Sequence, residues 1–363
     1  MKKAIIIDWL DKYGGAEKVI QAIEKVMNFD EIHCLVNIMN SAELKKVFPN
    51  NQSIKTSYLQ FLGKRFRFFY PFFFGAIKKI KVSNDVCLIF SSSHSVAKGV
   101  LKSNANQIHI SYFQAPNSNY IWQDAQMYFK SAYPLIKPFL TIFRRWDFKD
   151  GQIPDYIIVN SEYVKNWVKK NYSRESTIIY PPVDLAAFPF ESEKKDYYVV
   201  AGRIATIKRF DLVIKAFNEN NKELYVIGDG DELEQLKKRA NSTNIHFLGF
   251  QKVEVLSKFL QQAKGFIQMG VEGFGIAAIE SQSCGTPVLY YNKGGVTETV
   301  IDGITGLSFD KQNSSSLNEC IQRFEAKDWN HHLIHNHAQK FSTQQFEEKI
   351  KQFVNKVFDK EII

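Results

Sequence analysis

The sequence is short of cysteine, and its few cysteines lie far apart. Four occur among 363 residues, at Cys34, Cys87, Cys284 and Cys320, and no Cys-x-x-Cys pair is present. This spacing argues against a zinc site and against a disulfide framework. It fits a protein of a reducing compartment, the cytoplasm.

Long apolar runs are also missing. A membrane-spanning helix needs about 18 consecutive apolar residues, and no such run occurs. The N-terminal run Ala4–Ile7 is cut short by Asp8 and Asp11, so it predicts a first buried strand rather than the core of a signal peptide. No spanning helix is therefore expected.

A third absence concerns the turn after this strand. An oxidoreductase that binds a dinucleotide would carry Gly-x-Gly-x-x-Gly there, whereas this chain has Gly14-Gly15-Ala16. The two glycines still allow the backbone to approach a phosphate or a sugar closely at the start of a helix. A tight turn without a ligand is the alternative.

The composition is that of a globular protein with excess positive charge. Hydrophobic residues make up 45% and charged residues 23%, which argues against disorder, and 363 residues are enough for two domains. The formal net charge of +9 indicates a polyanionic partner, which is a nucleic acid, a nucleotide sugar or an anionic membrane surface.

Predicted buried strands alternate with amphipathic helices in two series, separated by the proline-containing segment 180–184. The pattern predicts an α/β fold of two Rossmann-like domains, 1–184 and 185–340, followed by a helix over 341–363. Ligands are expected where the carboxyl ends of the strands face a central cleft. The strands are expected at 4–7, 32–36, 86–90, 108–113, 157–159, 197–202, 224–228, 245–248, 266–269, 288–290 and 307–309.

The most informative stretch is 270–287, which reads GVEGFGIAAIESQSCGTP. It follows a predicted strand and opens a helix, whose first amides form an anion site. Glu272 precedes the helix, and Glu280 lies about two turns into it. Spacing alone leaves open a simple turn, but the stretch resembles the signature of retaining glycosyltransferases with the GT-B fold, family four, also called glycosyl transferases group 1. In that fold a C-terminal helix often crosses back to the first domain.

The resemblance implies how the donor is bound. In that family the first Glu contacts the transferred hexose and the second holds the ribose of the nucleotide, which gives these roles to Glu272 and Glu280. Backbone near Gly249 would distinguish guanine from uracil. The expected donor-binding residues are Arg203, Lys208, Gly249, Gly273, Phe274, Gly275, Ile276 and Glu280.

A second segment, Ala201–Asp211, supplies positive charge after a predicted strand. Arg203 and Lys208 suit the oxygens of a diphosphate, which gain charge as it leaves. The segment resembles the Gly-Arg…Lys-Arg-x-Asp of the same family, so Glu272, Arg203 and Lys208 are the expected catalytic residues. Asp211 is expected to cap the next helix. The alternative for this segment is a solvated basic loop.

No metal and no cofactor are expected. Asp229-Gly230-Asp231 is formally an Asp-x-Asp motif, but it opens a helix, where acidic residues favour the first turn. The resemblance places Gly-Asp-Gly there as a turn beside the nucleotide, without a metal. It also implies that Gly294-Gly295-Val296-Thr297-Glu298 shapes the phosphate pocket.

The first domain is expected to bind the acceptor through Gly14, Gly15, His94, Gln114 and Asn119. The run 91–99 resembles the Ser-Ser-His-x-Val-Ala-Lys-Gly of bacterial O-antigen mannosyltransferases, so His94 either binds the acceptor or is a satisfied loop residue. Gln114 stands where related mannosyltransferases usually have the His of His-Thr-Pro. A glutamine hydrogen-bonds a hydroxyl but does not carry a proton, which casts doubt on acid–base chemistry there.

Aromatic and basic residues interleave over 58–82 and again over 133–148. Such segments suit docking on an anionic lipid surface. Binding of single-stranded nucleic acid through stacking and a core-packing helix with a basic edge are the alternatives. Because acceptors of such enzymes are often lipid-linked, peripheral membrane docking is expected and nucleic-acid binding is not.

Together these features predict a retaining glycosyltransferase at the inner face of the cytoplasmic membrane. The resemblance implies GDP-mannose as donor and a glycan or lipid-linked saccharide as acceptor, in the synthesis of a cell-surface polysaccharide such as lipopolysaccharide O-antigen. A UDP-sugar-dependent transferase of the same fold and a non-catalytic protein that binds a sugar or polyanion are the alternatives. A retaining glycosidase would also use two carboxylates but has no reason to carry Arg203 and Lys208.

Overall fold

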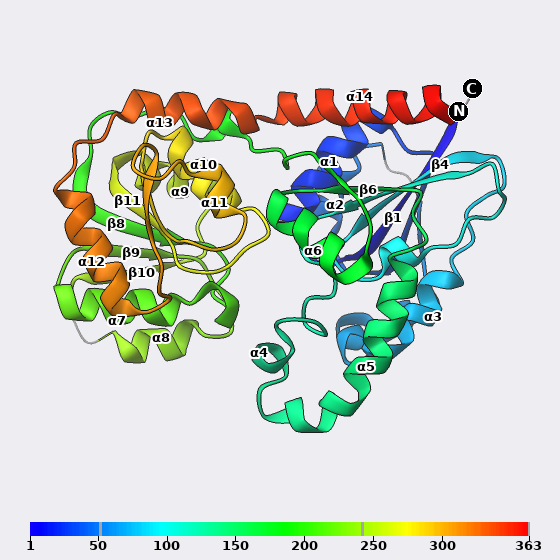
Figure 1. Ribbon diagram of the computed structural model, residues 1–363, viewed down its shortest axis with the longest axis horizontal. Coiled ribbons are helices and arrows are strands. Elements are labelled where there is room, and N and C mark those ends of the chain that lie inside the picture. Colours follow the sequence, from blue (N-terminus) through cyan, green and yellow to red (C-terminus); the bar gives the residue numbers. More distant parts are fainter. Residues whose placement is uncertain (51–52, 241–242, 362–363) are drawn as a thin grey trace. The chain divides into compact units, whose positions relative to one another are not determined.

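The computed structural model describes residues 1–50, 53–240 and 243–361 (Figure 1). The chain folds into two compact units. Unit 1 comprises Met1–Pro182 together with Phe346–Ile363, and unit 2 comprises Val183–Gln345. The chain therefore leaves unit 1 once and returns to it.

Unit 1 is built on a parallel sheet with the strand order β3-β2-β1-β4-β5-β6-β7. Its strands are β1 Lys2–Leu10, β2 Glu31–Asn37, β3 Ile54–Thr56, β4 Val86–Ser93, β5 Ile108–Phe113, β6 Tyr156–Val159 and β7 Thr177–Ile178. In the register of β1, Ile5 pairs with Ile32 of β2 on one side and with Phe90 of β4 on the other. Both faces of the sheet are covered, which explains why β1 reads as a nearly continuous apolar run.

Helices cover the two faces of this sheet (Figure 1). They are α1 Gly15–Met27, α2 Ser41–Val47, η1 Tyr58–Phe72, α3 Phe73–Lys78, η2 Ala97–Gly99, α4 Ala125–Phe129, η3 Lys130–Ala132, α5 Tyr133–Asp150, α6 Glu162–Tyr172 and α14 Thr343–Glu361. Alternate residues of β1 serve opposite faces. Ile5 and Ile7 pack in the cluster that includes α1 and α14, whereas Ala4 and Ile6 pack in the cluster formed by η1 and α3.

The C-terminal helix α14 completes the core of unit 1. Phe346, Ile350, Val354 and Val357 are buried in the same cluster as β1. Their spacing of three or four residues places them on one face of the helix. The ring of Phe346 meets that of Tyr112 in β5 edge-on, with 5.9 Å between the ring centroids.

Unit 2 carries a second parallel sheet, in the order β10-β9-β8-β11-β12-β13. Its strands are β8 Lys195–Ala201, β9 Leu224–Ile227, β10 Ile245–Gly249, β11 Ala263–Gln268, β12 Val288–Tyr291 and β13 Gly306–Phe309. Its helices are η4 Leu185–Ala187, η5 Thr206–Lys208, α7 Phe210–Asn220, α8 Leu233–Arg239, α9 Val253–Gln262, α10 Ile276–Ser283, α11 Val296–Thr299, α12 Ser314–Glu325, α13 His331–Ala338 and η6 Gln339–Phe341. The predicted alternation of strands and helices is therefore present in both units.

One predicted local feature is wrong. Asp211 was expected to cap α7, but the N-cap is Arg209, whose φ of 55° is left-handed. Asp211 instead lies in the first turn, where its Oδ1 is 3.0 Å from Nε of Arg209. The short edge strands β3 and β7 were not predicted, because two or three residues carry too little of an alternating pattern.

The structure also bears on the expected absence of a spanning helix. Within the three described ranges, no helix combines the length and apolarity that crossing a membrane requires.

Candidate active site

The predicted catalytic residues lie at the carboxyl ends of β8 and β11 in unit 2. Arg203 lies two residues after the end of β8, and Lys208 ends the short helix η5. Glu272 lies in the loop between β11 and α10. Loops that follow the strands of a parallel sheet gather at one edge of the sheet. The fold thereby brings Lys208 to Glu272 across 64 positions of sequence.

Three side chains form the centre of this site. Nζ of Lys208 donates a hydrogen bond to Oε1 of Glu272 at 2.6 Å, and Nε2 of Gln268 donates to the same oxygen at 2.5 Å. Gln268 is buried and also donates to the carbonyl oxygen of Gly270 at 3.3 Å. Oε1 therefore has two donors inside the protein, and Oε2 is the oxygen left for a ligand.

Positive charge dominates the electrostatics of Glu272. Burial alone would raise the pKa of its carboxyl group, but the charge and hydrogen bond of Lys208, the hydrogen bond of Gln268 and the charge of Arg203 lower that pKa below its usual 4.5. The carboxylate is thus ionised at neutral pH. The exposed guanidinium of Arg203 is close enough to act on it, so two cations and one anion share this edge of the sheet.

The helix α10 begins beside this cluster. Its N-cap is Gly275 with a φ of 96°, a conformation that favours glycine. Gly295 is also required: a Cβ there would lie 2.2 Å from the carbonyl oxygen of Gly273. The loop that precedes α11 is therefore packed directly against the backbone of the Gly273–Gly275 turn. The first amides of α10 point away from the helix, as at any helix N-terminus.

The other predicted donor residues lie in different surroundings. Phe274 is buried, with its ring edge-on to Phe341 at 5.7 Å, so its side chain packs inside unit 2. Ile276 is half-buried at the start of α10, and Glu280 is buried on the same helix. Gly249 ends β10 with a φ of 67°, and a Cβ there would meet open space.

The predicted acceptor residues lie at the corresponding edge of unit 1. Gly14 stands between β1 and α1, Gly15 begins α1, His94 follows β4, and Gln114 follows β5. Nε2 of Gln114 donates to Oγ of Ser92 at 2.5 Å and to the carbonyl oxygen of Ala16 at 3.2 Å. The amide nitrogen thus joins the end of β5 to the end of β4 and to the first turn of α1, and Oε1 of Gln114 is the atom left for a ligand.

Two further residues near this edge have partners within unit 1. Nδ2 of Asn119 donates to Oδ2 of Asp124, which uses one amide hydrogen of this predicted acceptor residue. Glu17 of α1 accepts a hydrogen bond from the amide of Gly14 at 3.0 Å. Burial raises the pKa of Glu17 to about 7, and the charge of Asp11 adds to this effect.

Sequence reasoning missed two residues of these edges. Gln268 reads only as the end of an apolar strand, and its contact with Glu272 depends on the path of the loop between them. Asp8 is fully buried although it is charged. A charge that interrupts an otherwise buried run was a usable signal, because buried charges need partners.

The part of the chain that the structure describes has no group of three or more His, Cys, Asp or Glu side chains arranged to hold a metal ion. Asp229 and Asp231 are thus not part of such a group. Oδ1 of Asp229 instead accepts a hydrogen bond from the amide of Gly230 at 2.7 Å.

Residues 185–348 match the family model described as glycosyl transferases group 1. This region belongs to that family. The group 1 region includes Arg203, Lys208, Gln268 and Glu272, and with them the whole of the candidate donor site.

Curated relatives of the chain include further glycosyltransferases. An uncharacterized glycosyltransferase of Methanocaldococcus jannaschii is 27% identical over 209 residues, which are 56% of this chain and 59% of that protein. A GDP-mannose-dependent alpha-(1-6)-phosphatidylinositol monomannoside mannosyltransferase of Mycolicibacterium smegmatis is 28% identical over 140 residues, 34% of this chain and 37% of that protein. The chain spans about half the length of the curated relatives it matches.

Solved structures extend the likeness to the whole chain. A sucrose-phosphate synthase of Thermosynechococcus elongatus has a TM-score of 0.74 at 17% identity and covers 99% of this chain and 100% of its own. HepE of Anabaena in complex with UDP-glucose has a TM-score of 0.69 at 16% identity, with 98% and 100% covered. The predicted GT-B fold of two parallel-sheet α/β domains is thereby confirmed.

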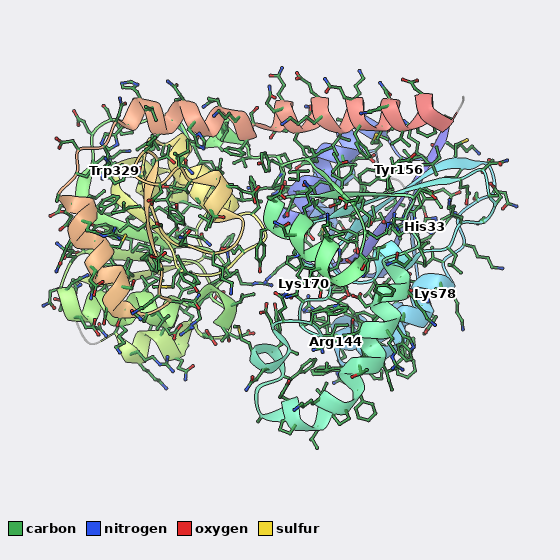
Figure 2. All side chains as sticks on the ribbon, in the orientation of Figure 1. His33, Lys78, Arg144, Tyr156, Lys170 and Trp329 are labelled. Atoms are coloured by element: carbon green, nitrogen blue, oxygen red, sulfur yellow. The ribbon has the colours of Figure 1, made fainter. Side chains whose placement is uncertain are left out.

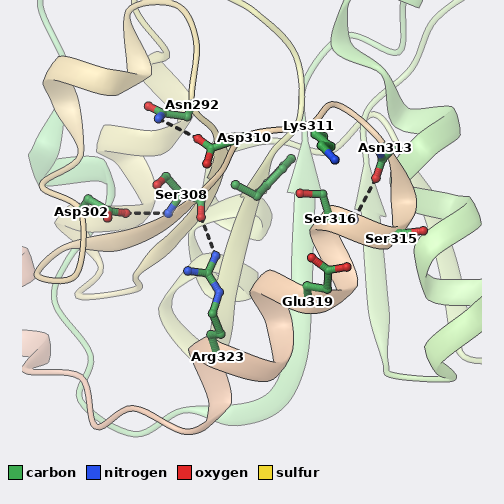
Figure 3. Close-up of a pocket in the computed structure, with 11 residues that line it drawn as sticks. Asn292, Asp302, Ser308, Asp310, Lys311, Asn313, Ser315, Ser316, Glu319 and Arg323 are labelled. Carbon is green, nitrogen blue, oxygen red and sulfur yellow. Dashed lines mark hydrogen bonds between the residues drawn. The ribbon is translucent and has the colours of Figure 1, made fainter.

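The group 1 region also contains a polar cavity of about 620 Å³ beside β12, β13 and α12 (Figure 3). Several of its polar groups bond one another. Asn292 donates to Asp310 at 3.0 Å, and Arg323 donates to the carbonyl oxygen of Ser308 at 2.9 Å. The cavity shares no residue with the predicted donor site.

Proposed function

We propose that this protein is a retaining glycosyltransferase that moves a hexose from a nucleotide sugar to a glycan or a lipid-linked saccharide. The observation that carries the proposal is the cluster of Lys208, Gln268 and Glu272, with Arg203 beside it, at the start of α10. It combines cations for a leaving diphosphate with a carboxylate whose Oε2 is left for a sugar hydroxyl. The family match supports this reading.

Each group then has a chemical task. Arg203 and Lys208 bind the diphosphate and stabilise the charge that develops on it as the bond to the hexose breaks. Oε2 of Glu272 accepts a hydrogen bond from a hexose hydroxyl, while Gln268 holds Oε1. The acceptor oxygen forms its bond to the sugar carbon on the face from which the diphosphate leaves. The proton of the acceptor hydroxyl passes to the departing phosphate. No side-chain base is needed, and retention follows from attack on that face.

We propose GDP-mannose as the donor. The resemblance of 91–99 to mannosyltransferases supports it, as does similarity to the M. smegmatis enzyme, whose name states dependence on GDP-mannose. The alternative is a UDP-sugar, because HepE, which has a similar fold, was solved with UDP-glucose. Since Arg203 and Lys208 supply positive charge for the diphosphate, we also propose that no divalent metal is required.

We place the acceptor on unit 1, at Gly14, Gly15, His94, Gln114 and Asn119, and propose synthesis of a cell-surface polysaccharide such as O-antigen. Oε1 of Gln114 is the group there that accepts a hydrogen bond from a saccharide hydroxyl. A protein that binds a sugar or polyanion without transferring it is the second candidate, and the replacement of the usual His by Gln114 favours it.

We further propose that unit 1 docks on the anionic inner face of the cytoplasmic membrane. The docking region, here named the aromatic–basic surface, is formed by η1, α3 and α5. Large apolar side chains are exposed on it: Phe61 is 80% exposed, Phe68 86% and Leu135 77%. Exposure to this extent is expensive in water and is common where a protein contacts a membrane.

Charge on the aromatic–basic surface favours an anionic bilayer. Residues 58–82 contain no Asp or Glu, and their basic residues are Lys64, Arg65, Arg67, Lys78, Lys79 and Lys81. Of these, Arg67 pairs with Asp11, and Lys78 pairs with Asp150 of α5 at 2.8 Å. Asp147 of α5 is buried against Lys98 and so offsets neither Lys137 nor Arg145. Lys78 and Arg144, labelled in Figure 2, lie on α3 and α5.

The two segments form one surface because they pack together. The ring of Tyr70 in η1 lies 5.9 Å from that of Phe143 in α5, and Phe74 in α3 lies 5.5 Å from Trp146. Some aromatic residues of η1, α3 and α5 therefore belong to the core, as expected for the alternative of a core-packing helix. Other rings of these helices stay exposed on the outer side. Nucleic-acid binding is a less favoured reading, because a lipid-linked acceptor accounts for the apolar exposure as well as the charge.

Thermal stabilisation by a panel of nucleotide sugars tests the proposed transferase. A donor at one hundred times its dissociation constant adds about 2.7 kcal/mol of stability. We expect a shift with GDP-mannose in EDTA, loss of that shift in Arg203→Ala, and retention of the GDP shift in Glu272→Gln with transfer lowered about 100-fold. A shift with UDP-sugars alone would overturn the donor, and binding without transfer would favour the second candidate.

A further inference from the structure

The loop that follows β4 is folded around one buried carboxylate. Asp8 of β1 has no exposed surface. Its Oδ2 accepts the amides of His94 at 2.7 Å and Ser95 at 2.9 Å, and its Oδ1 accepts those of Val96 and Ala97, each at 2.7 Å. Four consecutive amides therefore supply the hydrogen bonds that a buried carboxylate needs.

Other side chains of this loop also point into unit 1. Lys98 is fully buried and donates to Oδ1 of Asp147 at 2.7 Å. Oγ of Ser95 lies 2.6 Å from the hydroxyl of Tyr120. Gly99 leaves no room for a side chain, because a Cβ would lie 2.6 Å from Oδ2 of Asp150. These contacts explain most of the run 91–99 as a structural support, whereas the side chain of His94 is partly exposed.

The imidazole of His94 is held from one side. Its Nδ1 lies 3.1 Å from Oδ2 of Asp8, and its ring stands edge-on to Trp9 at 4.4 Å. The side chain is 33% exposed. Both oxygens of Asp8 already act as acceptors, so a proton on Nδ1 is favoured, and a neutral imidazole then has its lone pair on Nε2. No described residue bonds Nε2.

We propose that Asp8 is a positioning residue, which keeps the proton of neutral His94 on Nδ1 and presents Nε2 to accept a hydrogen bond from a saccharide hydroxyl. The ligand class rests on the proposed function, whereas the role of Asp8 does not. His94 lies at the strand edge that also carries Gly14 and Gln114, where ligands of parallel sheets bind. Nε2 of His94 and Oε1 of Gln114 are both acceptors, which matches a ligand rich in hydroxyl donors.

The first test is the tautomer of His94, read from the nitrogen chemical shifts of protein labelled with ¹⁵N-histidine at pH 8, with His94→Gln to assign the signal. The expected result is a protonated Nδ1 and an unprotonated Nε2. His33 is the matched control in the same protein, because its Nε2 lies 2.8 Å from Glu31 and should carry the proton. A proton on Nε2 of His94 would overturn the proposal.

The variant Asp8→Asn tests whether Asp8 sets the tautomer of His94. The variant should lose the preference for Nδ1, while His33 keeps its tautomer. An unchanged His94 signal in a folded Asp8→Asn protein would show that Asp8 does not set it. The wild-type measurement stands by itself if this variant fails to fold.

Titration with methyl glycosides of mannose, glucose, galactose and N-acetylglucosamine tests the ligand. We expect one of them to move the Nε2 resonance of His94 and to lose this effect in Asp8→Asn. If none moves it, the saccharide assignment is wrong even when the tautomer is as proposed. Neither result depends on nucleotide binding, so failure here is distinguishable from failure of the proposed transferase.

Discussion

Charged residues inside this protein are held by specific donors rather than by general polarity. Glu272 illustrates the rule in unit 2, where Lys208 and Gln268 bind one oxygen and leave the other to a ligand. The side chain of Glu272 is 24% exposed, and an ionised group removed this far from water needs such partners. Removing Gln268 would therefore act on the orientation of Glu272 before it acts on the fold.

Glu17 provides a prediction at the scale of single residues. Its pKa is raised from the ordinary 4.5 to about 7, mainly by burial. The folded protein then holds a proton that the unfolded chain releases, so stability falls as pH rises from about 4.5 to 7. The shift corresponds to about 3 kcal/mol at most. Glu17→Gln, which stays neutral and keeps an acceptor for the amide of Gly14, should remove this loss.

Denaturant unfolding at pH 5 and at pH 8 checks this expectation. Glu17→Gln should gain stability over the wild type at pH 8 and little at pH 5. Glu254→Gln, on an exposed position of α9, is the control and should follow the wild type at both values. Equal gains of Glu17→Gln at the two pH values would contradict the assignment.

The sequence singles out candidate residues where a local motif contains them, and the chemical roles of these residues stay predictions. Arg203, Lys208 and Glu272 each belong to a short motif, and the structure joins Lys208 directly to Glu272. Gln268 and Asp8 have no such motif, because their partners come from a loop path or from another strand. Contacts of this kind depend on tertiary structure and cannot be read from spacing.

Among the elements, η1 and α5 are exceptional because their outward faces are apolar. In α5, Leu135, Phe139 and Ile142 are exposed at a helical spacing of three or four residues, while Leu140 points to the core. An amphipathic helix usually turns its apolar side inward. A helix with apolar side chains on both its inward and its outward face is expected where the outward face also contacts an apolar environment.

Liposome co-sedimentation checks the aromatic–basic surface. Changing Lys64, Arg65 and Lys137 to Glu should lower binding to vesicles with phosphatidylserine about 100-fold or more, at roughly 1 kcal/mol for each basic residue. The charge-matched control changes Lys237, Lys238 and Arg239, which lie on α8 in unit 2.

Changing Phe61, Phe68 and Leu135 to Ser should weaken binding without altering the salt dependence, because these residues carry no charge. If both triple variants bind as the wild type does, the surface has another partner.

Element prediction succeeded where the hydrophobic pattern is long. The strands of both sheets follow continuous apolar runs, and α1 and α14 follow a period near 3.6. It failed at β3 and β7, and it gave no warning of the kinked η1, where Gly63 and Phe69 depart from helical geometry. The aromatic residues of η1 are so dense that every face of the helix is apolar. The 3.6-residue period of apolar positions, which marks an amphipathic helix, is therefore not visible there.

At the scale of the molecule, the return of the chain to unit 1 has an energetic consequence. Ile350 of α14 is fully buried in the core of unit 1. Ile350→Ala should cost about 2–5 kcal/mol, whereas Lys351→Ala on the exposed side should cost under about 0.5 kcal/mol.

Hydrogen exchange locates this effect. Amides of β1 should lose protection in Ile350→Ala, and amides of β8 in unit 2 should not. Loss of protection in β8 alone would contradict the assignment of α14 to unit 1.

The path of α14 also sets an order of events during synthesis. A ribosome makes residues 1–182 first, but α14, which shares the cover of one sheet face with α1, arrives only with Phe346–Val357. Unit 2 lies wholly between these segments and is complete earlier. Until α14 has been made, the part of this apolar face that α1 does not cover therefore stays exposed in unit 1. Chaperones that bind nascent chains are therefore expected to bind this apolar face before α14 packs on it.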